Sequence, residues 1–167
     1  MKHHDFMKGL RHDDIVAAIQ AAEAKTSGEI RIFVSQKPAT DAVAAAQKQF
    51  EELGMTQTHH RNGVLIYVAP AARQFAIIGD TGVHQHCGDA FWRQVADEMA
   101  GHFRQGDFSA GIIHGIQKAG VLLGWLVGWL VGWLVGWLAG WLAVLGAPFM
   151  LSVAAARLLF PAYQNWG

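Results

Sequence analysis

Two short apolar runs around a four-residue break constrain the fold of this chain more than any other feature. The runs are Val64–Ala69 and Gln74–Gly79, and the break, Pro70–Arg73, contains a proline. Short runs rich in Val, Ile, Tyr and Phe that flank such a turn are typical of a β-hairpin. Both faces of this hairpin carry apolar side chains, so both faces must be covered. Sheets covered on both faces are typical of α/β domains.

The hairpin brings polar residues together at one edge of the predicted sheet. With the turn at the proline-containing break, Gly63 pairs with Asp80. Asp80 therefore returns beside Arg61 and Asn62, which precede the first run. This edge is the best candidate for a functional site in the sequence.

A strand ahead of the hairpin extends the same edge. Residues 29–35 alternate in polarity and are rich in β-branched side chains, and Asp41 can cap the helix that follows. Strand, helix and hairpin strand form a βαβ unit, so the first two strands should run parallel. Glu29, which starts the first strand, then lies at the same edge as Arg61 and Asp80. Further helices are predicted over residues 13–25, 89–103 and from about 108 onward, and residues 1–12 as a polar lead-in.

Carboxylates and a guanidinium at one sheet edge allow two interpretations. In the first, Asp80 and Glu29 hold a divalent cation, Ca²⁺ or Mg²⁺, with loop carbonyls, and Arg61 stabilises charge on a phosphoryl group. In the second, Asp80 caps a turn and Arg61 pairs with Glu29 or Asp80 as a structural contact. Three further candidates at this edge are Asn62, His59 and His60, the histidines as acid, base or ligand.

Other site patterns are weak. His86, Cys87 and Arg93 fit the literal His-Cys-x5-Arg signature of cysteine-dependent phosphatases. That chemistry needs a thiolate beneath a loop of backbone N–H groups. The bulky residues in between, and the negative charge of Asp89, favour the first turn of a helix instead, so we interpret the match as accidental. The sequence does not favour nucleic-acid binding, because the charged part of the chain has no excess of the basic residues that would contact phosphates.

The C-terminal part of the chain is apolar. No charged residue occurs between positions 119 and 156, and residues 124–143 repeat GWLV three times and then GWLA twice. This pattern predicts a transmembrane helix over residues 121–145, followed by an interfacial or re-entrant tail at 146–167. Glycine at every fourth position forms a ridge on which two such helices can pack, which favours self-association. A repeat expanded by replication slippage explains the pattern equally well.

Four strings occur in a characteristic order: TSGEIRIFV (26–34), FEELGMTQTHHRNGVLIYVAPAARQFAIIGDTGV (50–83), FW (91–92) and FRQGDFSAGIIHGI (103–116). Together they resemble the TPM domain, a family named for a thylakoid lumen protein, a photosystem repair protein and a receptor-accessory protein. The resemblance implies an α/β/α sandwich with a Rossmann-like sheet. It also implies weak acid phosphatase activity, divalent-cation binding, and roles in repair or assembly of membrane complexes. The matching positions, Arg61–Gly63 and Gly79-Asp80, imply metal or phosphate at the predicted edge. The chain departs from short relatives in the apolar stretch before Phe160-Pro161.

We therefore predict a three-layer α/β/α Rossmann-like sandwich with a mixed sheet over residues 13–120, and a C-terminal transmembrane helix. The predicted function is a membrane-anchored accessory or binding module, able to bind Ca²⁺ or Mg²⁺, for assembly or maintenance of a membrane complex. The alternative is a slow metal-assisted acid phosphatase acting on phosphomonoesters, with Asp80 and Arg61 catalytic. Expected partners are membrane lipid, a membrane protein and a second copy of the chain. The domain is expected on the cytoplasmic side, because Arg104 and Lys118 precede the span and Arg157 follows it.

Overall fold

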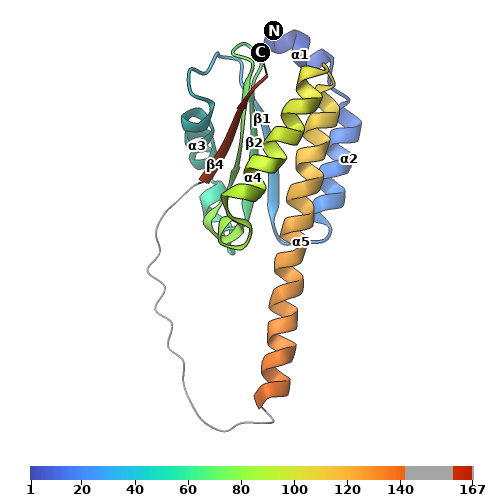
Figure 1. Ribbon diagram of the computed structural model, residues 1–167, viewed down its shortest axis with the longest axis vertical. Helices are drawn as coiled ribbons and strands as arrows, with labels where there is room; N and C mark the ends of the chain where they lie inside the picture. The colour runs from blue at the N-terminus through green and yellow to red at the C-terminus, as the bar shows by residue number, and fades with distance from the viewer. Residues whose placement is uncertain (142–159, 167) are drawn as a thin grey trace.

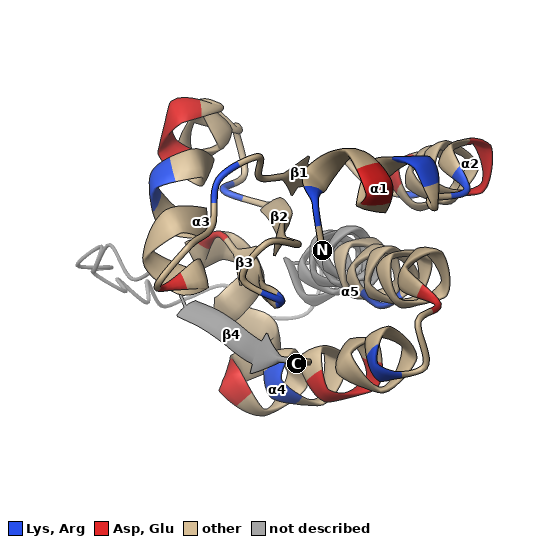
Figure 2. Ribbon diagram, turned by 90° about the horizontal axis from the view of Figure 1, so that it is seen from above, with Lys and Arg blue, Asp and Glu red and all other residues tan. Residues whose placement is uncertain are grey.

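A mixed sheet forms the centre of the structure, a computed structural model that describes residues 1–141 and 160–166, with side chains for residues 1–124 and Trp166. The strand order is β1-β2-β3-β4, with α3 on one face and α2, α4 and α5 on the other (Figure 1 and Figure 2). The strands are β1 Glu29–Val34, β2 Gly63–Ala69, β3 Gln74–Gly79 and β4 Phe160–Asn165. The helices are α1 His3–Lys8, α2 His12–Glu23, α3 Ala42–Glu52, the 3-10 turn Met55–Gln57, α4 Thr81–Arg104 and α5 Phe108–Trp141.

The hairpin has the register that its turn position predicts. Ile66 pairs with Ile77, and the Asp80 amide donates to the Gly63 carbonyl at 2.9 Å. Strand β1 runs parallel to β2, with Glu29 opposite Gly63, which confirms the βαβ unit. This is the parallel pair of the described sheet, and the β2–β3 and β3–β4 pairs are antiparallel. The molecule is therefore a mixed α/β fold in which the Rossmann-like element is limited to β1-α3-β2.

Strand β2 separates two apolar cores and is buried along its whole length. One set of its side chains, Val64, Ile66 and Val68, packs with helices α2, α4 and α5. The alternate set, Leu65, Tyr67 and Ala69, packs with α3. Burial of each large apolar side chain stabilises the fold by roughly 1.5–3 kcal/mol. The two-faced apolar pattern seen in the sequence is thus explained by a sheet covered on both sides.

The N-terminal segment and the start of helix α4 differ from the sequence prediction. Residues 1–12 are not a polar lead-in, because α1 buries Phe6 against Phe108 with ring centroids 5.0 Å apart. Helix α4 begins at Thr81 rather than Asp89, and it continues through a kink at Gly88, where φ is +68°. The residues from Thr81 to Gly88 look like a polar loop in sequence because only Val83 among them is buried on the first two turns of this helix.

The predicted transmembrane helix is wrong, and the predicted fold class is corrected accordingly. Residues 121–141 continue α5, a helix that begins at Phe108 within the domain. The first half of α5 packs into the core, where Ile112, Ile116, Ala119 and Leu123 are buried. Over the described part of the chain, none of the helices is both long enough and apolar enough to cross a membrane. Residues 142–145 of the predicted span lie outside the described residues.

Strand β4 occupies part of the tail that was predicted to be interfacial or re-entrant. Residues 160–165 pair antiparallel with β3, so that Ala162 lies opposite Ile77. Trp166, which follows, packs its ring against Phe75 and Phe103 at centroid distances of 5.8 and 4.9 Å. The remainder of that predicted tail, residues 146–159 and 167, lies outside the described residues.

Candidate functional site

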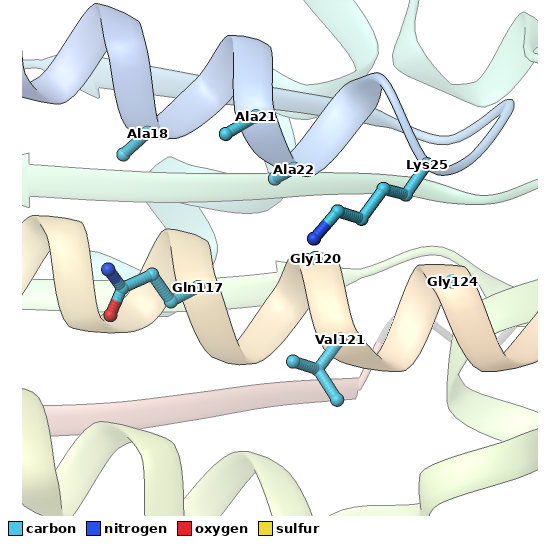
Figure 3. A pocket seen from close by; sticks show the side chains of 8 residues that line it. All are labelled: Ala18, Ala21, Ala22, Lys25, Gln117, Gly120, Val121 and Gly124. Atoms are coloured by element: carbon cyan, nitrogen blue, oxygen red, sulfur yellow. The ribbon is translucent and has the colours of Figure 1, made fainter.

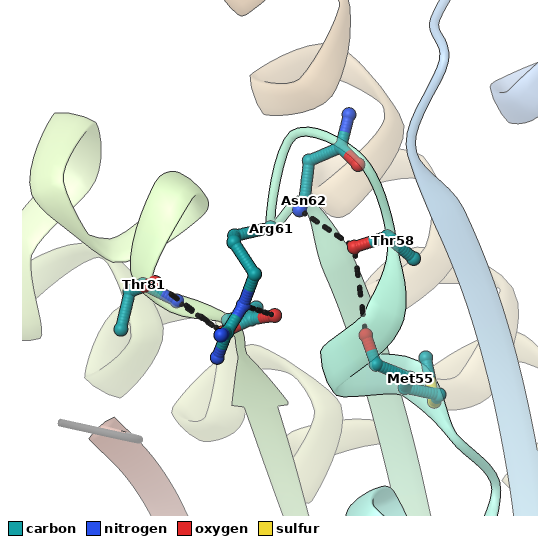
Figure 4. Close-up of polar contacts among 6 residues, drawn as sticks. Met55, Thr58, Arg61, Asn62 and Thr81 are labelled. Carbon is teal, nitrogen blue, oxygen red and sulfur yellow. Dashed lines mark hydrogen bonds and ion pairs between the residues drawn. The ribbon is translucent and has the colours of Figure 1, made fainter. Parts of the chain in front are cut away.

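Arg61 and Asp80 form a two-pronged ion pair at the edge of the sheet. Arg61 Nε donates to Asp80 Oδ2 at 2.7 Å, and Arg61 Nη2 donates to Asp80 Oδ1 at 2.8 Å (Figure 4). The Asp80 side chain is 0% exposed, whereas 38% of the Arg61 side chain is exposed. Such bidentate pairs combine charge with fixed geometry. The two residues that sequence reasoning placed together do meet, with the carboxylate facing inward and the guanidinium outward.

Asp80 also caps helix α4. Its Oδ1 atom accepts from the Thr81 backbone N–H at 2.7 Å, and its carbonyl accepts from the amides of Val83 and His84. An aspartate at this position satisfies donors that the first helical turn leaves without intrahelical partners. Both carboxylate oxygens of Asp80 are therefore engaged within the protein. The observed geometry is that of the second interpretation drawn from the sequence, in which Asp80 is a cap and its pairing with Arg61 is a structural contact.

The loop before β2 packs tightly on the start of α4. Arg61 has a left-handed backbone, with φ at +51°, and its carbonyl accepts from the Gly82 amide at 2.9 Å. A Cβ atom at Gly82 would lie 2.4 Å from the His60 carbonyl oxygen and 2.7 Å from that of Arg61. Only a glycine fits this approach without displacing the loop. Backbone contacts thus fix the loop that carries Arg61 against the helix that Asp80 caps.

The electrostatics of the pair follow from this burial. Hydrogen bonding to Asp80 raises the pKa of Arg61, and the Asp80 charge adds to this effect while partial burial opposes it. Removal of one partner from a buried ion pair costs about 3–5 kcal/mol when the remaining charge stays buried. Here the buried partner is Asp80, so the guanidinium is what makes its burial tolerable.

Asn62 serves a different part of the structure. Its amide group donates from Nδ2 to Ser27 Oγ at 3.2 Å, and its backbone N–H faces Thr58 Oγ1 at 3.3 Å. The residue is 5% exposed, and among the described groups its Oδ1 atom is buried without a hydrogen-bond partner. In Figure 4 the Asn62 side chain points away from Arg61. Asn62 therefore ties the loop before β1 to β2 and does not join the ion pair.

Glu29 lies at the predicted edge but does not share a ligand with Asp80. Its Oε1 atom accepts from Arg31 Nε, its neighbour on the same strand face. His59 and His60 are exposed, with their rings edge to face at a centroid distance of 4.6 Å. Within the described residues, no three His, Cys, Asp or Glu side chains converge as a metal site would require. In this arrangement the residues do not fit a Ca²⁺ or Mg²⁺ ion bridging Asp80 and Glu29.

Comparison with known families identifies the domain. The family model for the TPM domain (TPM_phosphatase) matches residues 2–122. This chain belongs to the TPM domain family. The match covers every element from α1 to the first half of α5, and it confirms the resemblance on which the sequence prediction rests. The comparison with curated proteins gives no match.

Two solved structures resemble this TPM domain. The NMR structure of the BA42 protein from the psychrophilic bacterium Bizionia argentinensis is 38% identical with a TM-score of 0.64, and the match covers 70% of this chain and 83% of that one. The NMR structure of the N-terminal domain of a P. gingivalis protein is 19% identical with a TM-score of 0.51, covering 64% of this chain and 69% of that one. At this lower identity the likeness shows the fold alone.

Cys87 of this TPM domain is not placed as a phosphatase nucleophile. It lies in the second turn of α4, where its thiol donates weakly to the Val83 carbonyl at 3.5 Å. Burial raises the pKa of the Cys87 thiol to about 11. A nucleophilic cysteine requires the opposite shift. The cysteine-phosphatase signature is therefore accidental, as its local sequence predicts.

A second charged cluster, on the outer side of the TPM domain, has no signal in the sequence. Glu98 on α4 accepts hydrogen bonds from His114 and from Gln94, and it pairs with Lys118 at 3.2 Å. The His114 hydrogen bond is the main reason why the pKa of Glu98 falls to about 2. Because His114 and Lys118 lie on α5, the cluster joins two helices whose relative position no local pattern specifies.

Proposed function

We propose that this TPM domain is a non-catalytic accessory module that binds a protein partner through the edge around Arg61. The observation that carries the proposal is the state of Asp80, which is fully buried and engaged at both oxygens. A carboxylate in this position stabilises the fold. A nucleophile, general base or metal ligand must instead reach a substrate or an ion.

The alternative, a slow metal-assisted acid phosphatase, has less support from the geometry. It requires Asp80 and Glu29 to face one cation, but each carboxylate is bound to a different arginine. Both pairs would have to separate before an ion could bridge them, and separating the buried pair costs several kcal/mol. Cation binding thus stays a prediction that needs a rearranged edge, and the accessory module does not depend on it.

The exposed side of the edge suggests the chemistry of the partner. Arg61 Nη1 takes no part in the two hydrogen bonds to Asp80, and part of the guanidinium faces solvent. His59 and His60 are exposed beside it. A guanidinium with free donors and two imidazoles favours carboxylate groups, so the proposed partner presents an acidic segment.

Two measurements on the purified full-length chain test this proposal. The first is hydrolysis of p-nitrophenyl phosphate at acid pH, with Mg²⁺ or Ca²⁺ and with chelator. We expect no turnover. Turnover that follows the protein through purification and disappears with chelator would contradict the accessory module and support the phosphatase.

The second measurement is an NMR titration with an oligoglutamate peptide, which stands in for the acidic segment. We expect saturable shifts at residues 59–62 that the double variant His59→Ala/His60→Ala weakens and that the variant His4→Ala, another exposed histidine, leaves unchanged. The absence of such shifts at low salt would contradict the proposed partner chemistry.

A further inference from the structure

A groove separates helices α2 and α5 on the face opposite α3. Its volume is about 490 Å³, and it is lined by Ala18, Ala21 and Ala22 of α2, by Lys25 after that helix, and by Gln117, Gly120, Val121 and Gly124 of α5 (Figure 3). This volume lies within the range of small-molecule sites. The groove shares no residue with the Arg61–Asp80 pair and takes no part in the proposed function.

The groove exists because small residues face each other where the two helices approach. A Cβ atom at Gly120 would lie 2.6 Å from the Ala22 Cβ atom, so the helices touch at this point with no room for a side chain. On the open side of this contact the walls carry short or β-branched apolar side chains together with the polar amide of Gln117. Val121 is 62% exposed there, which makes it the most exposed large apolar residue among the described side chains. Val121 therefore leaves apolar surface exposed at the groove.

One cation lies at the mouth of this apolar groove. The Lys25 side chain is exposed and extends toward Gly120 across the opening (Figure 3). In the described residues it forms no ion pair, whereas Lys118 on α5 is bound to Glu98 on α4. A lysine of this kind covers apolar surface with its alkyl stem and offers its ammonium group to an anion.

We propose that this groove binds a long-chain fatty carboxylate as a free monomer. The alkyl chain lies along Ala18, Ala21 and Val121, and the carboxylate pairs with the Lys25 ammonium. Charge complementarity selects this ligand, because the trough is lined mainly by apolar residues, with Gln117 as its one neutral polar side chain and Lys25 as its one cation. Such a trough matches an apolar chain with a single terminal anion. The proposal is independent of the proposed function, since the two surfaces share no residue.

The experiment is a titration of the full-length, ¹⁵N-labelled chain with hexadecanoate below its micelle concentration. We expect saturable amide shifts at Ala18–Ala22 and at Gly120. Hexadecanol, which has the same chain without the charge, should bind about fivefold more weakly, corresponding to about 1 kcal/mol for a partly exposed ion pair.

Two variants and their matched controls locate the site. Lys25→Glu should weaken hexadecanoate binding at least about fivefold, and Ala21→Leu should abolish it by filling the groove. The controls are Lys48→Glu and Ala44→Leu, which make the same changes on exposed positions of α3 and should leave binding unchanged. Amide spectra of all four variants report whether each remains folded.

Three outcomes overturn the proposal. In the first, amide shifts are confined to residues beyond Gly124, which would mean adsorption to the apolar repeat. In the second, neither Lys25→Glu nor Ala21→Leu changes binding although both variants are folded. In the third, hexadecanoate causes no saturable shift.

Discussion

Arg61 and Asp80 are nineteen residues apart in the chain, yet their side chains share two hydrogen bonds at the point where β2 begins and α4 starts. The pair is asymmetric, because Asp80 is enclosed while Arg61 reaches solvent. The same aspartate caps α4, so one side chain joins the hairpin, the preceding loop and helix α4. This explains how a charged edge can be a structural element of the domain rather than an open site.

The asymmetry predicts unequal effects of removing the two partners. Arg61→Met leaves a buried carboxylate without its cation and should lower the free energy of unfolding by about 3 kcal/mol. Asp80→Asn leaves a guanidinium that water can solvate and an amide that still caps the helix, so it should cost about 1–2 kcal/mol. Denaturant unfolding of both variants measures the difference.

The control for this pair is Arg73→Met. Arg73 is exposed and has a left-handed backbone with φ at +52°, so it carries the same backbone strain as Arg61 without the buried partner. We expect its substitution to change stability by less than about 0.5 kcal/mol. Equal losses for Arg61→Met and Asp80→Asn would contradict the asymmetric description.

Gly82 and Gly101, both on α4, should respond in opposite directions to the same substitution. Gly82→Ala forces a Cβ atom against two backbone oxygens and should destabilise the fold by about 1–3 kcal/mol. Gly101→Ala meets nothing within 4 Å and should stabilise α4 by about 0.5–1 kcal/mol. Thermal and denaturant unfolding of the two variants provides the comparison, and stabilisation by Gly82→Ala would show that the loop does not rest on this helix.

Much of the hairpin was predictable because its determinants are local. The apolar runs, the proline-containing break and the alternation of faces specify the register that pairs Ile66 with Ile77. Strand β4 was missed because its partners on β3 are 81 to 91 residues away in the chain, and residues 160–165 carry no alternation of their own. The start of α4 was missed because Gly88 resembles a helix break in sequence, whereas the helix absorbs it as a kink.

The site was predictable in place but not in role. Register alone puts Arg61, Asn62 and Asp80 at one edge, and the structure brings the first and last of these into contact. Whether a carboxylate is free or engaged depends on side-chain directions that sequence does not specify. One signal was present, since Glu29 and Arg31 are two residues apart and must share a strand face. That spacing favours their pairing over a cation shared with Asp80.

The raised pKa of Cys87 predicts that its thiol is alkylated slowly in the folded protein. With a pKa of about 11, set by burial, the thiolate is a small fraction at pH 8, and the rate of alkylation by iodoacetamide should rise steadily with pH until it approaches that value. In denaturant, where the thiol is solvated, the rate at pH 8 should increase by at least about tenfold. A native rate equal to the denatured rate at pH 8 would mean that the helix does not shield this side chain.

The Glu98 cluster predicts acid sensitivity of the α4–α5 contact. Its carboxyl has a pKa of about 2 in the folded protein against 4.5 in the absence of its partners, chiefly because His114 donates a hydrogen bond to it. Since the folded pKa is the lower one, the stabilisation is present in full above pH 4.5 and is lost as pH falls towards 2. The stability difference between the wild type and Glu98→Gln should therefore shrink over this window, whereas Glu51→Gln, an exposed glutamate on α3, should show no such cluster-dependent change. Urea unfolding at pH 7, 4 and 2.5 measures the difference, and a constant gap between wild type and Glu98→Gln across these pH values would contradict the cluster.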